Sequence, residues 1–67
     1  MNTTIKEDGK VYNICLIDDG TLDTVVSVNG EHYRFDSCHA YRSNDGSMKQ
    51  EGFDLLANDA LDLHLDK

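Results

Sequence analysis

Apolar and polar residues alternate along the first half of the chain in the manner of short β-strands. The segment from Lys10 to Ile17 is rich in β-branched and aromatic residues, and the turn signal Asp18-Asp19-Gly20 follows it. Thr21 to Val28 and Glu31 to Asp36 have the composition of two further strands. Asn29-Gly30 lies between them and is the strongest short-range hairpin signal. The pattern therefore predicts three consecutive antiparallel strands.

A two-residue loop at Asn29-Gly30 also predicts the register of the hairpin, from Val28 opposite Glu31 to Asp23 opposite Asp36. In this register one face collects the mainly apolar residues Leu22, Thr24, Val26, Val28, Tyr33 and Phe35. The other face collects Asp23, Val25, Ser27, His32, Arg34 and Asp36. A slip of one residue would reverse the faces of one strand, so the separation supports the register. Asp23 opposite Asp36 is unfavourable, so either the ladder ends before this pair or the pair faces a cation.

The pattern changes to a helical one in the last third of the chain. The apolar residues that recur at helical spacing are Phe53, Leu56, Ala57, Ala60 and Leu61. Ser47 and Gln50 have the spacing of a capping box. Gly52 would cost a helix about 1 kcal/mol in its interior, which favours a start after Gly52. The sequence predicts a short helix in this region.

The C-terminal segment allows two interpretations. Leu61 to Asp66 alternates between apolar and polar residues, which is a strand pattern. A continued helix would place Asp62 and Asp66 against the helix dipole, at about 0.3–1 kcal/mol each. We expect the helix to end near Asp59 and a strand to run from Leu61 to Leu65, with one longer helix as the alternative. The predicted fold class is α+β, a small antiparallel three- to four-stranded β-meander with one short helix.

Length and charge restrict the possible functions. The 67 residues are too few for two domains or a deep cleft, so we expect a single small domain over residues 1–67, with residues 1–9 as a flexible polar arm. Thirteen acidic residues against six basic ones give a net charge of −7, which opposes direct binding to nucleic acid. No apolar stretch approaches the roughly 20 residues of a membrane span, and the N-terminus lacks the pattern of a signal peptide. We expect a cytoplasmic protein.

No residue pattern indicates catalysis or a metal site. Cys15, His32, Cys38 and His39 lack the paired spacing of zinc ligands, and Cys38 beside His39 has no orienting third group. Asp18-Asp19-Gly20 and Asn44-Asp45-Gly46 do not fit the calcium-loop pattern. Without a secretory signal, free thiols are favoured over a disulfide. We expect no enzymatic activity, no cofactor and no metal.

The acidic residues are the remaining candidate feature. Ten of the thirteen are Asp, whose short side chain holds a charge in a more fixed place than Glu. Rows of Asp on a strand or helix resemble the spacing of phosphates and would attract a basic groove. A net charge of this size also serves solubility alone. The predicted partner-binding residues are Asp18, Asp19, Asp23, Asp36, Tyr41, Asp45, Asp54, Asp59 and Asp62. Tyr41 is included as an aromatic anchor.

In its general character the chain resembles the small acidic proteins that phages encode to disarm host defences, the anti-CRISPR and anti-restriction proteins, some of which mimic DNA. The likeness rests on the Asn29-Gly30 hairpin, on Asp18-Asp19, and on the acidic residues at 54, 59 and 62. It implies an inhibitor that acts in the host cytosol and binds a basic nucleic-acid-handling protein, such as a CRISPR effector or a nuclease. Arg34, Arg42 and Asn58 interrupt the acidic rows, which departs from a strict duplex mimic.

A homo-oligomer is the alternative function. A core this small gains from a second copy, and an unpaired strand edge would allow two sheets to join. In a homodimer of this kind, the interface would include Leu61, Leu63 and Leu65.

Overall fold

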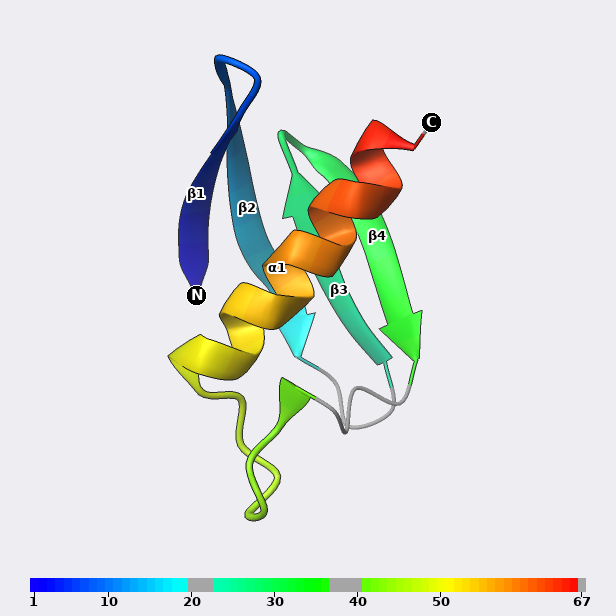
Figure 1. Cartoon of the computed structure of the whole chain (residues 1–67). Coiled ribbons are helices and arrows are strands. Elements are labelled where there is room, and N and C mark those ends of the chain that lie inside the picture. The colour runs from blue at the N-terminus through cyan, green and yellow to red at the C-terminus, as the bar shows by residue number, and fades with distance from the viewer. Residues whose placement is uncertain (20–22, 37–40, 67) are drawn as a thin grey trace.

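Four consecutive strands form one antiparallel sheet, and a C-terminal helix crosses one of its faces (Figure 1). The computed structural model describes residues 1–19, 23–36 and 41–66. The elements are β1 (Asn2–Glu7), β2 (Lys10–Asp19), β3 (Asp23–Val28), β4 (Glu31–Asp36) and α1 (Gln50–Leu65). The strands lie in sequence order, so the sheet is a meander. The predicted α+β class, with an antiparallel meander and one helix, is confirmed.

The hairpin of β3 and β4 has the predicted register at every position, from Val28 opposite Glu31 to Asp23 opposite Asp36. Asn29 and Gly30 have φ angles of 50° and 88°. Positive φ at both central residues is what a two-residue turn needs to match the twist of its strands, and Asn followed by Gly adopts it at low cost. Turn chemistry therefore determines this half of the sheet.

Residues 1–9 do not form the flexible polar arm that we expected. β1 pairs with β2 from Asn2 opposite Cys15 to Glu7 opposite Lys10. Asp8-Gly9 is a second two-residue turn, with φ angles of 50° and 77°. Asp-Gly has the same turn chemistry as Asn-Gly. The segment is polar because β1 is an edge strand, of which only Thr3 and Ile5 are half-buried.

Asp18 and Asp19 belong to β2 and not to the turn that they were expected to form. They pair with Val25 and Thr24, and the register shifts between Leu16 and Asp18. A β-bulge of this kind lets a strand continue while it bends and twists more strongly. The strand thus carries its two terminal acidic residues to the end of the sheet.

The C-terminal segment is helical, so the strand expected from Leu61 to Leu65 is wrong and the single-helix alternative is right. Leu61 is 2% exposed within the helical apolar stripe, whereas Leu63 and Leu65 are 48% and 45% exposed. Burying one Leu side chain contributes about 1.5–3 kcal/mol. That gain is larger than the unfavourable effect of Asp62 on the helix dipole.

The start of the helix also differs from the expectation. The residue before the first turn is Lys49, which makes no side-chain capping hydrogen bond. Ser47 is not part of a capping box, because its hydroxyl donates instead to Asp45. Gly52 lies inside the helix. A Cβ atom at Gly52 would overlap the backbone carbonyl oxygen of Tyr41 and lie 2.8 Å from the carbonyl carbon. The glycine therefore permits the chain before the helix to pass close against it.

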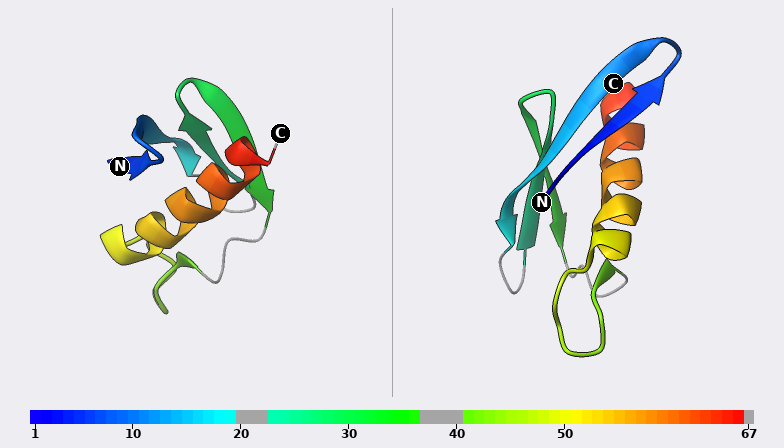
Figure 2. Two further views of the ribbon diagram at one scale, coloured as in Figure 1. Left: turned by 45° about the horizontal axis from the view of Figure 1, so that its top comes forward. Right: turned by 90° about the vertical axis from the view of Figure 1, so that its left-hand side faces the viewer.

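The core lies between the helix and the sheet, and no described helix or strand covers the opposite face of the sheet (Figure 2). The helix contributes Phe53, Leu56, Ala57, Ala60 and Leu61 to this core. The sheet contributes Tyr12, Ile14, Val26 and Val28, with Met48 beside them. In this two-layer arrangement α1 covers one face of the sheet. The surfaces that remain for contact with other molecules are the flanks of α1, the outer strands and the opposite face of the sheet.

Replacing Gly52 with Ala should destabilise the fold by about 1–3 kcal/mol, because the added methyl group overlaps the Tyr41 carbonyl oxygen. In an unconstrained helix interior the same change would stabilise by about 1 kcal/mol. The free energy of unfolding by urea measures the difference. A stabilised Gly52→Ala protein would contradict the close approach.

Candidate partner-binding groove

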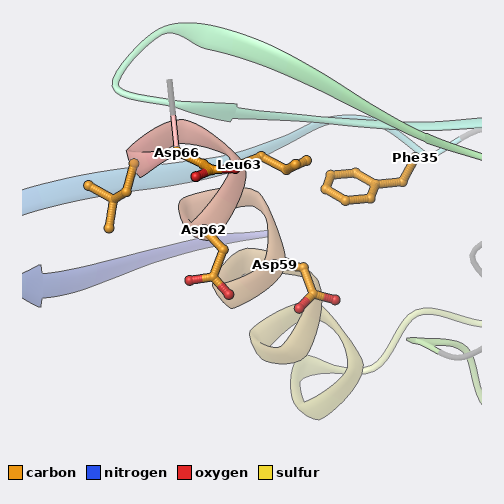
Figure 3. Close-up of a pocket in the computed structure, with 6 residues that line it drawn as sticks. Phe35, Asp59, Asp62, Leu63 and Asp66 are labelled. Atoms are coloured by element: carbon orange, nitrogen blue, oxygen red, sulfur yellow. The ribbon is translucent and has the colours of Figure 1, made fainter.

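A shallow groove of about 560 Å³ runs along the C-terminal half of α1, beside β4. We call it the acidic groove, and its lining residues are Phe35, Asp59, Asp62, Leu63, Leu65 and Asp66. Figure 3 shows the side chains of Leu63 and Phe35 directed toward one another, with the carboxylates of Asp59 and Asp62 directed away from the sheet. The groove thus combines apolar side chains with three carboxylates, and none of these lining residues is a cation.

Helical spacing places the acidic side chains on one flank of α1. Asp62 and Asp66 follow Asp59 at i+3 and i+7, and Leu63 follows it at i+4, so all four lie along the same side of the helix. Phe35 comes from the helix-facing side of β4 and is half-buried against the core. The groove therefore depends on a helix that continues through residues 61–65.

A polar cluster holds the end of α1 against β4. The Tyr33 hydroxyl lies 2.7 Å from His64 Nδ1 and 3.0 Å from Glu31 Oε2. A hydroxyl has one hydrogen, so if Tyr33 donates to Glu31 it accepts from the Nδ1–H of His64. The imidazole also makes edge contacts with Tyr12 and Tyr33, at ring-centroid distances of 5.7 Å and 5.9 Å. These contacts set the position of the helix relative to β4 and so the shape of the groove.

Tyr41 is joined to the acidic groove through a hydrogen bond from its hydroxyl to the Asp59 carboxylate. Its ring is half-buried and packs against the core. Tyr41 was predicted as an aromatic anchor for a partner. The hydrogen bond shows that Tyr41 positions one carboxylate of the groove.

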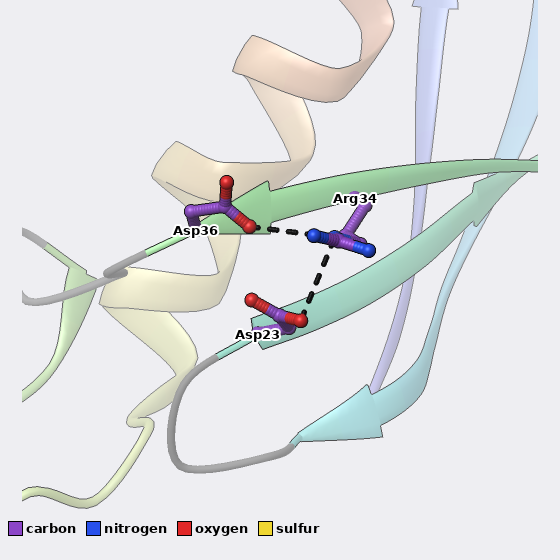
Figure 4. Close-up of polar contacts among 3 residues, drawn as sticks. All are labelled: Asp23, Arg34 and Asp36. Atoms are coloured by element: carbon purple, nitrogen blue, oxygen red, sulfur yellow. Dashed lines mark hydrogen bonds and ion pairs between the residues drawn. The ribbon is translucent and has the colours of Figure 1, made fainter.

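A second group of predicted residues lies at the end of the sheet. Arg34 Nε lies 3.5 Å from Asp23 Oδ2 and 3.3 Å from Asp36 Oδ1 (Figure 4). The opposed Asp pair therefore faces a cation, which was one of the two arrangements expected for it. Asp18 is exposed nearby in β2, and the side chain of Asp19 lies outside the described part of the chain. Arg34 offsets part of the negative charge at this end.

Asp45 and Asp54 have local partners and do not line the acidic groove. The Ser47 hydroxyl and backbone N–H donate to Asp45 at 2.6 Å and 2.9 Å. These hydrogen bonds, the hydroxyl first, hold the pKa of Asp45 below its ordinary value because they stabilise the carboxylate. Asp54 accepts from Gln50 Nε2 at 2.9 Å, one helical turn away. Asp45 thus stabilises the turn before α1.

The predicted partner-binding residues include Asp59 and Asp62 of the groove but not its other lining residues, Phe35, Leu63, Leu65 and Asp66. The i, i+3, i+7 spacing of Asp59, Asp62 and Asp66 was an available signal. It was hidden by the alternating pattern of residues 61–65, which favoured a strand. Nothing in the sequence indicated that Phe35 would lie beside them.

The described residues contain no group of three or more His, Cys, Asp or Glu side chains arranged to hold a metal ion. Cys15 is half-buried on the uncovered face of the sheet, and Cys38 and His39 lie outside the described residues. Across residues 1–19, 23–36 and 41–66, no helix has the length and apolar character needed to span a membrane.

No protein-family model, curated protein or solved structure matches this chain.

Replacing Arg34 with Gln should destabilise the protein by up to about 1 kcal/mol, because Asp23 and Asp36 would then oppose each other without the cation. The effect is small since the three side chains are 65%, 45% and 71% exposed for Arg34, Asp23 and Asp36. Adding Asp23→Asn should recover most of the loss in urea unfolding at low salt. Equal stability of the single and double variants would contradict the bridging role.

Proposed function

We propose that this protein is an acidic protein–protein interaction module that binds a basic nucleic-acid-binding protein and inhibits it as a decoy. The acidic groove carries the proposal, because three carboxylates lie beside apolar side chains and the lining residues that the structure describes include no cation. Such a surface suits Lys and Arg, whose long stems cover apolar groups while the charged head binds a carboxylate.

The aromatic ring of Phe35 strengthens this match. Guanidinium groups are attracted to the face of an aromatic ring as well as to carboxylates. The net charge of −7 would also steer a basic partner toward the protein at long range. Phosphate groups compete for the same Lys and Arg side chains of the partner, so binding would exclude nucleic acid.

The partner class follows from this competition. Nucleases and CRISPR effectors hold nucleic acid in channels lined with positive charge. Their charge is therefore complementary to that of an acidic decoy. The resemblance to phage-encoded inhibitors of host defence supports the same class. A decoy for such enzymes would act in the cytosol of the host cell.

Neutralising the groove should weaken binding to a purified CRISPR effector or nuclease by about tenfold or more, since three partner contacts are lost together. The groove variant is Asp59→Asn/Asp62→Asn/Asp66→Asn. The matched control is Glu7→Gln/Asp8→Asn/Glu51→Gln, which removes the same charge from exposed positions outside the groove. Fluorescence anisotropy with the labelled protein measures the affinity, and about 0.5 M salt should release the complex.

Two results would count against the proposal. Equal loss in the groove and control variants would mean that total charge, and not the groove, drives association. Failure of every basic nucleic-acid-binding protein in the panel to bind at low salt would remove the decoy function itself.

A homo-oligomer is the second candidate. β1 and β4 are the outer strands of the sheet, and Val11 and Ile17 of β2 are exposed. Leu61 is buried within its own chain, so of the C-terminal Leu residues only Leu63 and Leu65 are accessible.

For the homodimer we expect light scattering to give twice the 7.5 kDa mass of the chain at about 0.1 mM, because a modest edge interface needs a high concentration to assemble. A mass of 7.5 kDa throughout the concentration series would contradict this candidate.

A further inference from the structure

The acidic groove lies beside β4, an outer strand of the sheet. The acidic lining and the strand edge together favour one kind of occupant. We propose that the partner enters the acidic groove as an extended basic segment that pairs with the outer edge of β4 as a fifth strand. This inference rests on the proposed function and specifies which surface of the protein performs it and what chemistry the partner must present.

The register of the hairpin determines which backbone groups β4 offers. Val28 and Glu31 flank a two-residue turn and so form a hydrogen-bonded pair with each other. Hydrogen-bonded pairs recur at every second residue, so Glu31, Tyr33 and Phe35 bond to β3. The N–H and C=O groups of His32, Arg34 and Asp36 then point to the outer edge. Among the described strands, none pairs with that edge.

A strand added at this edge would alternate its side chains between the two faces of the sheet. Those on the helix side would lie next to Phe35 and along the flank of α1 that carries the groove carboxylates. Asp59 and Asp66 are seven residues apart, about 10 Å along the helix axis. Alternate residues of a strand are about 7 Å apart. Two or three Lys or Arg residues at alternate positions would therefore match the row of acids.

The contacts of α1 indicate how the row lies relative to β4. Asp59 is bonded to Tyr41, which follows β4, and His64 is bonded to Tyr33 within β4. The C-terminal half of α1 therefore lies beside β4, and its carboxylates project outward from that flank, within reach of long Lys or Arg side chains. A basic side chain at each end of an added strand would find a different carboxylate.

The other face selects against a uniformly basic segment. His32, Arg34 and Asp36 carry their side chains on the uncovered face, where Arg34 supplies a positive charge. On that face, polar uncharged side chains of the added strand are favoured, because a Lys or Arg side chain would be repelled by Arg34. The preferred partner segment therefore alternates basic and neutral residues. A helical partner would satisfy its own backbone and leave the edge of β4 unused.

The experiment uses a synthetic peptide of seven residues in which Lys or Arg alternates with Thr, added to the full chain at millimolar concentration. Edge pairing predicts slower hydrogen exchange at the amides of His32, Arg34 and Asp36. It predicts little change at Glu31, Tyr33 and Phe35, which already bond to β3. An isomeric peptide with its basic residues clustered at one end should bind at least about threefold more weakly, because fewer of its charges reach the row of acids.

Backbone methylation of the peptide provides a direct control. Methyl groups on one alternate set of peptide nitrogens should abolish exchange protection, whereas the other set should be tolerated, because only one set faces β4. The groove variant at positions 59, 62 and 66 should lose binding of the alternating peptide, and the control variant at positions 7, 8 and 51 should keep it.

The outcomes separate this inference from the proposed function. If a basic protein binds through the groove acids but the three edge amides stay unprotected, or if both methylated peptides bind equally, edge pairing is wrong and the decoy function stands. If neither peptide nor basic protein responds to neutralising the groove acids, the proposed function fails as well. Protection of the edge amides by self-association alone, with no peptide, would assign the edge to a second copy.

Discussion

The packing of one apolar helix stripe against one face of the sheet is the interaction on which the rest of the molecule depends. Phe53 and Leu56 from α1 meet Ile14, Val26 and Val28 from the central strands, and all five are fully buried. Each such side chain contributes about 1.5–3 kcal/mol. A chain of 67 residues supports only one core of this kind. The helix must therefore cross the middle of the sheet, which leaves its flank near β4 open as a groove.

Polar contacts around this core determine orientation more than stability. The Arg42 guanidinium lies 3.2 Å from the hydroxyl of buried Thr24 and 3.0 Å from the Gly46 carbonyl, which ties the segment before the helix to β3. The cluster of His64 and Tyr33 ties the other end of the helix to β4. Because both ends are attached, α1 has one position on the sheet. The position of Asp59, Asp62 and Asp66 is therefore also fixed.

The net charge of −7 is divided among different tasks. Asp23 and Asp36 share Arg34, and Asp45 accepts from Ser47 in a turn. The acidic residues of the groove instead lie beside Phe35 and Leu63, and the described lining residues include no Lys or Arg. A carboxylate beside apolar surface is a better receptor for a Lys or Arg side chain than one fully surrounded by water. Placement, and not total charge, therefore distinguishes the groove.

The sequence by itself determined the hairpin of β3 and β4 and the apolar stripe of the helix, because turn chemistry and helical periodicity act between near neighbours. The same local signal is present at Asp8-Gly9, whose two-residue turn joins β1 to β2. Tertiary structure alone decided that residues 61–65 are helical, since both periodicities fit and only the burial of Leu61 separates them. It also decided the groove, because Phe35 and Asp59 are far apart in sequence and meet only after the helix packs across the sheet.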